Sequence, residues 1–281
     1  MNNALIKEYY NNLLKLKALD DEEAKKQLRT DLFSKILENN ILFKFISITS
    51  DKRLNEQKIA CLKNDSLWCS AQYLLRNNDP SEFDLPVDIN KVEQRTPCSR
   101  QQIQELTPLF KELSDLCCFT TEVNEFMWQN YANNHSGICC VFEVIDNTDL
   151  MPVLYCKKNE VDFTEQLIDA INSRNDKEKA KKLNIFAILP FILKNEENYK
   201  NENEIRFLTR DAYDDESGVL EGRAAPGKKE ALGYKGMSVP YKNCGLKLTA
   251  IIFGKNIPEY EKHEIENILI NKEDIILSNE V

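Results

Sequence analysis

Histidine is scarce in this chain of 281 residues, which contains only His135 and His263. Nine cysteines are present, but none form a C-x-x-C pair, and two pairs are adjacent, at 117–118 and 139–140. Adjacent residues on a strand point to opposite faces, so such pairs neither chelate one ion nor bridge readily. We therefore expect no metal site, and we expect reduced thiols that fill the core.

Long apolar runs are also missing. The longest candidate, residues 184–193, contains Pro190 and is far shorter than the ~20 residues that span a bilayer. The start of the chain, M-N-N-A-L-I-K-E, lacks the apolar core of a signal peptide. We expect no membrane contact and synthesis in the cytoplasm, and translocation into a host or target cell stays open.

Positive charge is in deficit, because the formal net charge is −9. Proteins that bind nucleic acids usually present a basic face, so a nucleic-acid partner is not expected. Apolar residues make up 42% and charged residues 30%, a balance typical of a globular chain. The length suits one large domain, or a domain with a sizeable insertion.

The hydrophobic pattern alternates between short strands and helices, which favours the α+β class. An N-terminal helical segment is expected at residues 1–40 and a main domain at 41–281, with a helical insertion at about 160–198. Strands are expected at 41–48, 66–71, 116–121, 137–145, 153–156, 204–209 and 246–253, and helices at 54–64, 89–114, 126–134, 163–194 and 259–271.

Two carboxylates, Glu202 and Glu204, stand two residues apart at the start of the expected strand 204–209. Residues at this spacing share one face of a strand. Cleavage of a ribosyl bond builds positive charge on the sugar, which one carboxylate can stabilise while a second deprotonates a nucleophile. Mutual repulsion raises the pKa of one of the two, which suits a base. The alternative is a solvated strand end.

Aromatic residues follow the strand that ends in Phe119, Thr120 and Thr121. Trp128 and Tyr131 are three residues apart and share one face of a helical turn. Together with the threonine hydroxyls they could line a pocket for a planar ring. The alternative places Trp128 in the core and lets Tyr131 satisfy a buried partner.

The order of several short motifs resembles a bacterial family of unknown function. These motifs are K-F near the first strand, N-D-P at 78–80, C-F-T-T, W-x-x-Y-A-x-x-H-x-G-I-x-x-x-F, E-x-E-x-R and a terminal I-I-F-G. The resemblance spans roughly residues 41–254. We connect this family to the ADP-ribosyltransferase superfamily, whose members clamp NAD in a split β-sandwich and whose arginine-specific members often carry E-x-E.

The resemblance implies roles for particular residues. Glu204 matches the catalytic glutamate and Glu202 the accessory one. Phe119, Thr120 and Thr121 match the superfamily's S-T-S strand, with threonine in place of serine. Lys44 stands where the superfamily has Arg or His on its first strand. The remaining cofactor-binding candidates are Trp128, Tyr131 and Asn78.

The implied function is NAD-dependent mono-ADP-ribosylation of a protein side chain, such as arginine, by a bacterial effector or toxin. NAD would be the substrate, no metal would be needed, and the acceptor would be a protein such as a host enzyme. Two alternatives remain open. One is an NAD glycohydrolase or a toxin that modifies nucleic acid. The other is an interaction module that kept the fold and lost the chemistry.

Overall fold

In the computed structural model of the chain, the described residues are 2–17, 22–75, 82–84, 86–111, 114–157, 160–173, 189–209, 229–272 and 274–280. They form a mixed α+β structure with a mostly antiparallel sheet, which confirms the expected α+β class. Asn78, Asp79 and Pro80 lie outside the described residues. No helix in the described ranges is long and apolar enough to cross a bilayer.

The sheet is built around strand β3 (Asp115–Thr120). From edge to edge the order is β11 (Ile276–Asn279), β10 (Leu246–Phe253), β4 (Ile138–Val144), β1 (Ile41–Ile46), β3, β2 (Ser66–Ala71) and β9 (Gly236–Pro240). Strand β8 (Glu204–Leu208) pairs with β3 and with β5 (Leu150–Pro152). Two short strands, β6 (Leu154–Cys156) and β7 (Leu193–Asn195), pair with each other in parallel.

The sheet parts where β1 and β2 meet β3. Strand β2 pairs with the start of β3, through Ser70 opposite Leu116, and β1 pairs with its end, through Phe43 opposite Thr120. Among the described strands, residues 117–119 of β3 pair with neither β1 nor β2 on that edge, while residues 116–120 pair with β8 on the other. A gap therefore opens between β1 and β2.

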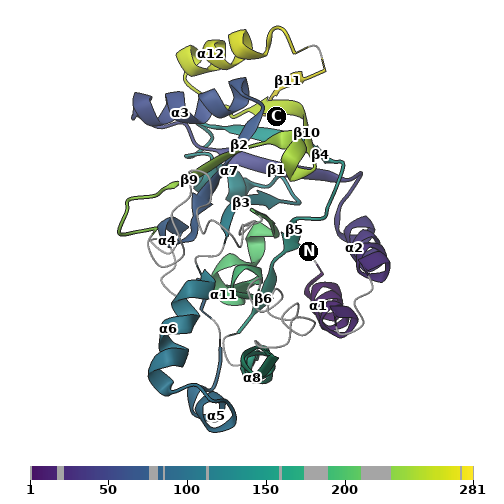
Figure 1. The fold of residues 1–281 in the computed structure, drawn as a ribbon. Helices are drawn as coiled ribbons and strands as arrows, with labels where there is room; N and C mark the ends of the chain where they lie inside the picture. The colour runs from purple at the N-terminus through teal and green to yellow at the C-terminus, as the bar shows by residue number, and fades with distance from the viewer. Residues whose placement is uncertain are drawn as a thin grey trace.

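Helices lie at both ends of the molecule (Figure 1). Helices α3 (Lys52–Lys63) and α12 (Glu259–Leu269) lie side by side and pack on one face through Ile59, Leu62, Ile265 and Leu269. Helix α7 (Glu125–Tyr131) packs against β1. The other end holds α1 (Asn3–Lys17), α2 (Glu22–Ile36), α5 (Ile89–Arg95), α6 (Arg100–Lys111) and α8 (Thr164–Ser173), whose apolar side chains form a second core.

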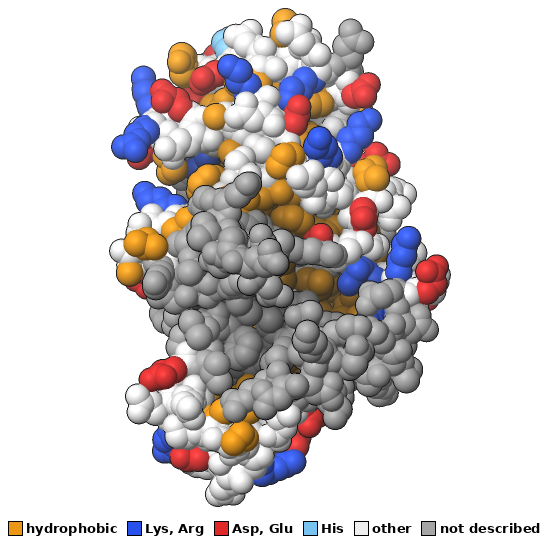
Figure 2. Space-filling view, in the orientation of Figure 1, with side chains coloured by type: hydrophobic (Ala, Val, Ile, Leu, Met, Phe, Trp, Pro, Cys, Tyr) orange, Lys and Arg blue, Asp and Glu red, His pale blue; other side chains and the backbone are white. Residues whose placement is uncertain are grey.

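Charged side chains of both signs are interspersed over the described part of the face seen in the orientation of Figure 1 (Figure 2). Around α3 and α12 at the top of this view, lysine and arginine alternate with aspartate and glutamate. Within the described residues, this face therefore carries no extended basic patch of the kind that binds a phosphate backbone.

The adjacent cysteines alternate between faces as expected. Cys139 packs with α7, whereas Cys140 packs beneath α3 and α12. Cys117 joins the core beneath α3 and α12, and Cys118 packs against the second core. No disulfide joins any of the nine cysteines, and six of them are buried. They behave as small core residues.

Three expected boundaries differ from the structure. The helix expected at 89–114 is two helices, α5 and α6, because Pro97 lies between them and disfavours a continuous helix. The helix expected to run to Lys194 ends earlier, since residues 193–195 are strand β7. Glu202 is not on a strand: it ends a 3-10 turn (Lys200–Glu202), and Asn203 follows with φ 45° in the left-handed region.

Strands β9 and β11 were missed, as were the short strands β5 and β7. Strand β9 reads G-M-S-V-P, and glycine and proline are poor strand formers. Strand β11 is exposed along its whole length, so its sequence shows no buried face. It is held by parallel pairing with β10, the kind of long-range contact that hydrophobic periodicity does not reveal.

Candidate functional site

A cleft of about 230 Å³ opens at the gap between β1 and β2. Its walls include Phe43, Lys44, Trp68, Ser70, Cys117, Cys118, Phe119, Thr120, Tyr131, Lys194, Tyr199, Glu82, Glu202 and Glu204. A larger hollow of about 680 Å³ lies around Tyr241 and Gly245, and none of the site residues expected from the sequence line it. We place the candidate site at the smaller cleft, because charged and aromatic side chains converge there.

Six of the nine expected site residues line this cleft: Lys44, Phe119, Thr120, Tyr131, Glu202 and Glu204. Trp128 does not, which corrects the expectation of a ring pocket built on it. Its side chain is 3% exposed, stacks on His135 and meets Phe45 edge to face. Thr121 lies just beyond the end of β3 and is not part of the cleft wall. Asn78 is outside the described residues.

Glu204 is held from two sides by cations. Arg206, two residues along β8 and fully buried, donates from Nε to Glu204 Oε1 at 2.7 Å and from Nη2 to Oε2 at 3.1 Å. Lys194 Nζ donates to Glu204 Oε2 at 3.0 Å. Burial opposes ionisation, but the charges of Arg206 and Lys194 outweigh it and hold the pKa of Glu204 well below its usual range. Glu204 is therefore a fixed carboxylate.

Glu202 has a different environment although it lines the same cleft. Its Oε2 accepts from Lys194 Nζ at 2.6 Å, and its Oε1 accepts from the hydroxyl of Tyr131. Burial, and then the charge of Glu204, raise the pKa of Glu202 above its ordinary value, while Lys194 opposes the rise. The expected difference between the two carboxylates is present, with Glu202 as the more basic one.

Lys194 joins the two glutamates and was missed by the sequence reasoning. Its Nζ also lies 3.8 Å from Glu82 Oε1 and 4.6 Å from the centre of the Tyr199 ring. Burial lowers the pKa of this ammonium group, but Glu204, Glu82 and Glu202 raise it above its ordinary value. The available signal was a lone lysine at the end of an apolar run, residues 185–194.

Arg206 anchors the cluster to the core. Its guanidinium also donates to the carbonyl of Phe191 at 2.9 Å and to Glu82, and it lies 5.4 Å from the ring of Phe83. The hydroxyl of Tyr155 accepts from the backbone N–H of Glu204 at 2.8 Å. Buried charges are tolerated only when paired and hydrogen-bonded, so these contacts hold Glu204 in place.

Lys44 marks the β1 side of the cleft. Its ammonium donates to the carbonyl of Cys118 at 3.3 Å and lies 5.7 Å from the centre of the Phe119 ring. It therefore brings positive charge to the β1 wall of the cleft. Trp68 of β2 lines the cleft and is 44% exposed, so the accessible indole of this site is Trp68 rather than Trp128.

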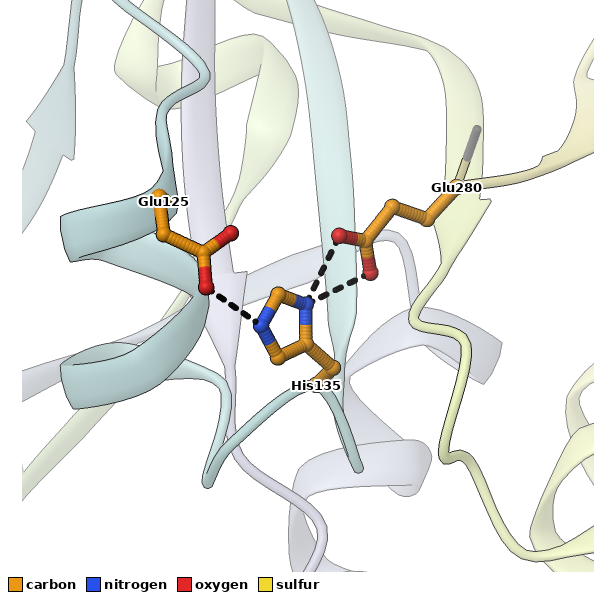
Figure 3. A group of neighbouring side chains, drawn as sticks. All are labelled: Glu125, His135 and Glu280. Carbon is orange, nitrogen blue, oxygen red and sulfur yellow. Dashed lines mark hydrogen bonds and ion pairs between the residues drawn. The ribbon is translucent and has the colours of Figure 1, made fainter.

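His135, in the loop after α7, lies outside the cleft and between two carboxylates (Figure 3). Its Nε2 is 3.1 Å from Glu125 Oε1, and its Nδ1 is 2.7 Å from Glu280 Oε1. Ligand atoms of the three residues lie within 4.8 Å of one another. The carboxylates meet different ring nitrogens, whereas one ion binds only one of them, so the arrangement fits hydrogen bonding between the loop and the end of β11.

The two glycines of the H-x-G-I and I-I-F-G motifs meet beside this loop. Gly254 N–H donates to the carbonyl of Gly137 at 3.0 Å. A Cβ at Gly137 would stand 2.1 Å from the carbonyl oxygen of Ile46, and one at Gly254 would stand 2.2 Å from that of His135. Only residues without a side chain allow the backbones to approach this closely.

Replacing Gly137 with alanine is expected to lower the free energy of unfolding by about 1–3 kcal/mol, because β1 and β4 must separate to admit the methyl group. Urea unfolding followed by circular dichroism measures the change. The neighbouring Ser136→Ala is the control and is expected to stay within about 0.5 kcal/mol. An unchanged midpoint for Gly137→Ala would show that the strands accommodate the extra volume at no cost.

Comparison with known proteins finds one family model that matches, described as a protein of unknown function (DUF2971), over residues 127–207. This segment contains the W-x-x-Y-A…H-x-G-I motif and the E-x-E-x-R motif, and it covers fewer than half of the 281 residues. No curated protein and no solved structure gives a significant match. Over residues 127–207 the chain is thus similar to a family whose function is unknown, as its motifs suggested.

Proposed function

We propose that the chain is an NAD-consuming mono-ADP-ribosyltransferase whose site is the cleft between β1 and β2. The observation that carries the proposal is the convergence of Glu202, Glu204, Thr120 and Tyr131 on one cleft, although Glu202 follows Tyr131 by 71 residues in the sequence. An interaction module that had lost its chemistry has no need to bury two carboxylates at the wall of a cleft, since buried charge is costly.

The parting of the sheet supports the comparison with a split β-sandwich. Strands β1 and β2 diverge over β3, and the cleft lies at the point of divergence. The first-strand residue Lys44 and the third-strand residue Thr120 both line it, as the resemblance implies. The volume, about 230 Å³, is below the ~300–1,000 Å³ of typical ligand pockets, so the cleft would hold the nicotinamide riboside half of NAD.

The chemistry assigned to Glu204 follows from its charge. In the proposed reaction the bond between ribose C1′ and the nicotinamide nitrogen breaks, and nicotinamide leaves with the electron pair. Positive charge develops on the ribose, and the fixed carboxylate of Glu204 would accept a hydrogen bond from the 2′-hydroxyl and stabilise that charge. Arg206 and Tyr155 hold Glu204 in position.

Glu202 suits the second half of the reaction. Its higher pKa makes it the stronger base of the pair, so it would take the proton from the acceptor as the acceptor attacks C1′. An arginine side chain of a target protein is the acceptor that the E-x-E spacing suggests, which fits a bacterial effector or toxin. Attack by water at the same carbon would make the protein an NAD glycohydrolase.

The test is incubation of the purified protein with NAD labelled in the adenosine half, together with a mixed cell lysate. A labelled protein band supports the transferase and delivers the acceptor for identification. Free labelled ADP-ribose without a band would indicate the glycohydrolase. Unchanged NAD, combined with no change of the melting temperature when NAD is added, would refute both enzymes and favour the interaction module.

A further inference from the structure

One buried cation, Lys194, touches both carboxylates that carry the proposed reaction. Its Nζ is 2.6 Å from Glu202 Oε2 and 3.0 Å from Glu204 Oε2, and its side chain is 8% exposed. It comes from β7, a strand outside the main sheet. The resemblance stated from the sequence assigns it no role.

The two glutamates differ in how many cations they meet. Glu204 pairs with both Arg206 and Lys194, whereas Lys194 is the only cation that ion-pairs with Glu202 among the described residues. Removing Lys194 would thus leave Glu204 with Arg206, but it would leave Glu202 facing a buried negative charge and the neutral hydroxyl of Tyr131.

We propose that Lys194 is a positioning residue that holds Glu202 in the cleft in its ionised form, ready to accept a proton from the acceptor. This inference rests on the proposed function. Lys194 does not touch the reacting carbon in this scheme. It acts through Glu202, by hydrogen bonding to Oε2 and by offsetting the charge of Glu204.

Lys194 is a poor candidate for the acceptor itself. Three carboxylates, from Glu82, Glu202 and Glu204, surround its ammonium group and favour the protonated state, which has no electron pair for attack. Its contact with the face of the Tyr199 ring stabilises the same charged form. The geometry therefore assigns Lys194 to holding a base, not to nucleophilic attack.

Among the described residues, the titratable and charged groups that act on Glu202 include Tyr131 of α7, Tyr155 of β6, Lys194 of β7 and Glu204 of β8. Of these, only Lys194 is a cation. An opposite charge in contact lowers the pKa of a carboxyl group by about 1–3 pH units. Loss of Lys194 should therefore move the titration of Glu202 to higher pH by about that amount, so Glu202 would be protonated over a wider range.

The first measurement is direct. The full-length protein is labelled with ¹³C at the glutamate carboxyl carbons, and Glu202 is assigned from the signal that disappears in Glu202→Gln. In Lys194→Met the titration midpoint of Glu202 should rise by about 1–3 pH units. Lys194→Arg should restore most of the wild-type midpoint, because arginine carries the same charge. Lys91→Met, which removes an exposed lysine far along the chain, should leave it unchanged.

The second measurement is the pH profile of ADP-ribosyl transfer from NAD to arginine methyl ester, because transfer is the step assigned to Glu202. Hydrolysis of NAD is followed separately as free ADP-ribose. The acid limb for Lys194→Met should move to higher pH by the same interval. At a fixed pH on that limb, the rate of Lys194→Met should be about tenfold below the wild-type rate for each pH unit by which the midpoint of Glu202 rises. At higher pH, where Glu202 is ionised in both proteins, the rate of the variant should recover. If Lys194→Met folds poorly, Lys194→Gln takes its place.

The outcomes separate the two proposals. A wild-type protein that releases nicotinamide while Lys194→Met keeps the wild-type profile and midpoint overturns the role of Lys194 alone. A loss of rate that is equal at every pH also overturns it, because that is the mark of general structural damage. A wild-type protein that releases no nicotinamide overturns the proposed function, and the role of Lys194 in catalysis with it, even if the midpoint of Glu202 moves.

Discussion

Replacing Glu204 with glutamine is expected to reduce the rate of nicotinamide release from NAD by about 10²–10³-fold, or about 2.7–4 kcal/mol in the barrier. Glutamine keeps the shape of the side chain and one acceptor oxygen but removes the negative charge. In the proposed reaction that charge matters most in the transition state, where the ribose becomes positive. The loss should therefore appear in kcat rather than in KM.

The matched control for this experiment is Glu202→Gln, which changes a carboxylate in the same cleft. It is expected to abolish transfer to an acceptor while leaving measurable hydrolysis of NAD, because the proposed role of Glu202 is to activate the acceptor. Nicotinamide and ADP-ribose are quantified by chromatography, and the melting temperature of each variant separates catalytic loss from unfolding. Wild-type turnover by Glu204→Gln would remove Glu204 from the mechanism.

The second large effect is on stability. Arg206 is fully buried and pairs with Glu204 and Glu82, so in Arg206→Met these two carboxylates must share the single cation Lys194 with Glu202. Removing one partner from a buried ion pair costs about 3–5 kcal/mol, because the remaining charge is uncompensated. The free energy of unfolding in urea at pH 7 should fall by that amount. If the free energy of unfolding decreases by less than about 1 kcal/mol, water must reach these carboxylates.

The pH dependence gives an independent check on the same variant. The pKa of Glu204 is depressed in the folded protein, so its contribution to stability is present above the ordinary glutamate pKa of about 4.3 and is lost as the pH falls toward the folded value. In Arg206→Met much of this depression disappears. The difference in stability between wild type and variant should therefore narrow as the pH is lowered below about 4. An exposed control, Arg95→Ala, should barely change stability, since exposed pairs contribute little.

Much of the architecture was predictable from local patterns. Short apolar runs located β1, β2, β3, β4, β8 and β10, because buried strands are rich in apolar residues, and helical spacing located α3, α7 and α12, because each helix buries a stripe that repeats with the period of its backbone. Breaks in regular spacing were less predictable. Glu202 and Glu204 looked like neighbours on one strand, but Asn203 adopts a left-handed conformation that asparagine tolerates and sequence spacing does not reveal.

The candidate site was also predictable in part. Lys44, Thr120, Tyr131, Glu202 and Glu204 were identified by chemistry and order, and all five line one cleft. Trp128 was identified by the same reasoning but belongs to the core, because an aromatic residue on a helix face packs equally well against a ligand or against Phe45. Only burial separates these two outcomes.

The sequence by itself determined the residue types available for chemistry and the α+β class. It also supplied Gly137 and Gly254, whose lack of side chains allows their backbones to approach closely. The tertiary structure alone decided that β1 and β2 part over β3, and that Lys194 reaches both glutamates of the cleft. The physical reason is the separation along the chain of the residues that interact. Periodicity and propensity depend on neighbours along the chain, whereas pairing of buried charges depends on contacts between segments that only the packed fold brings together.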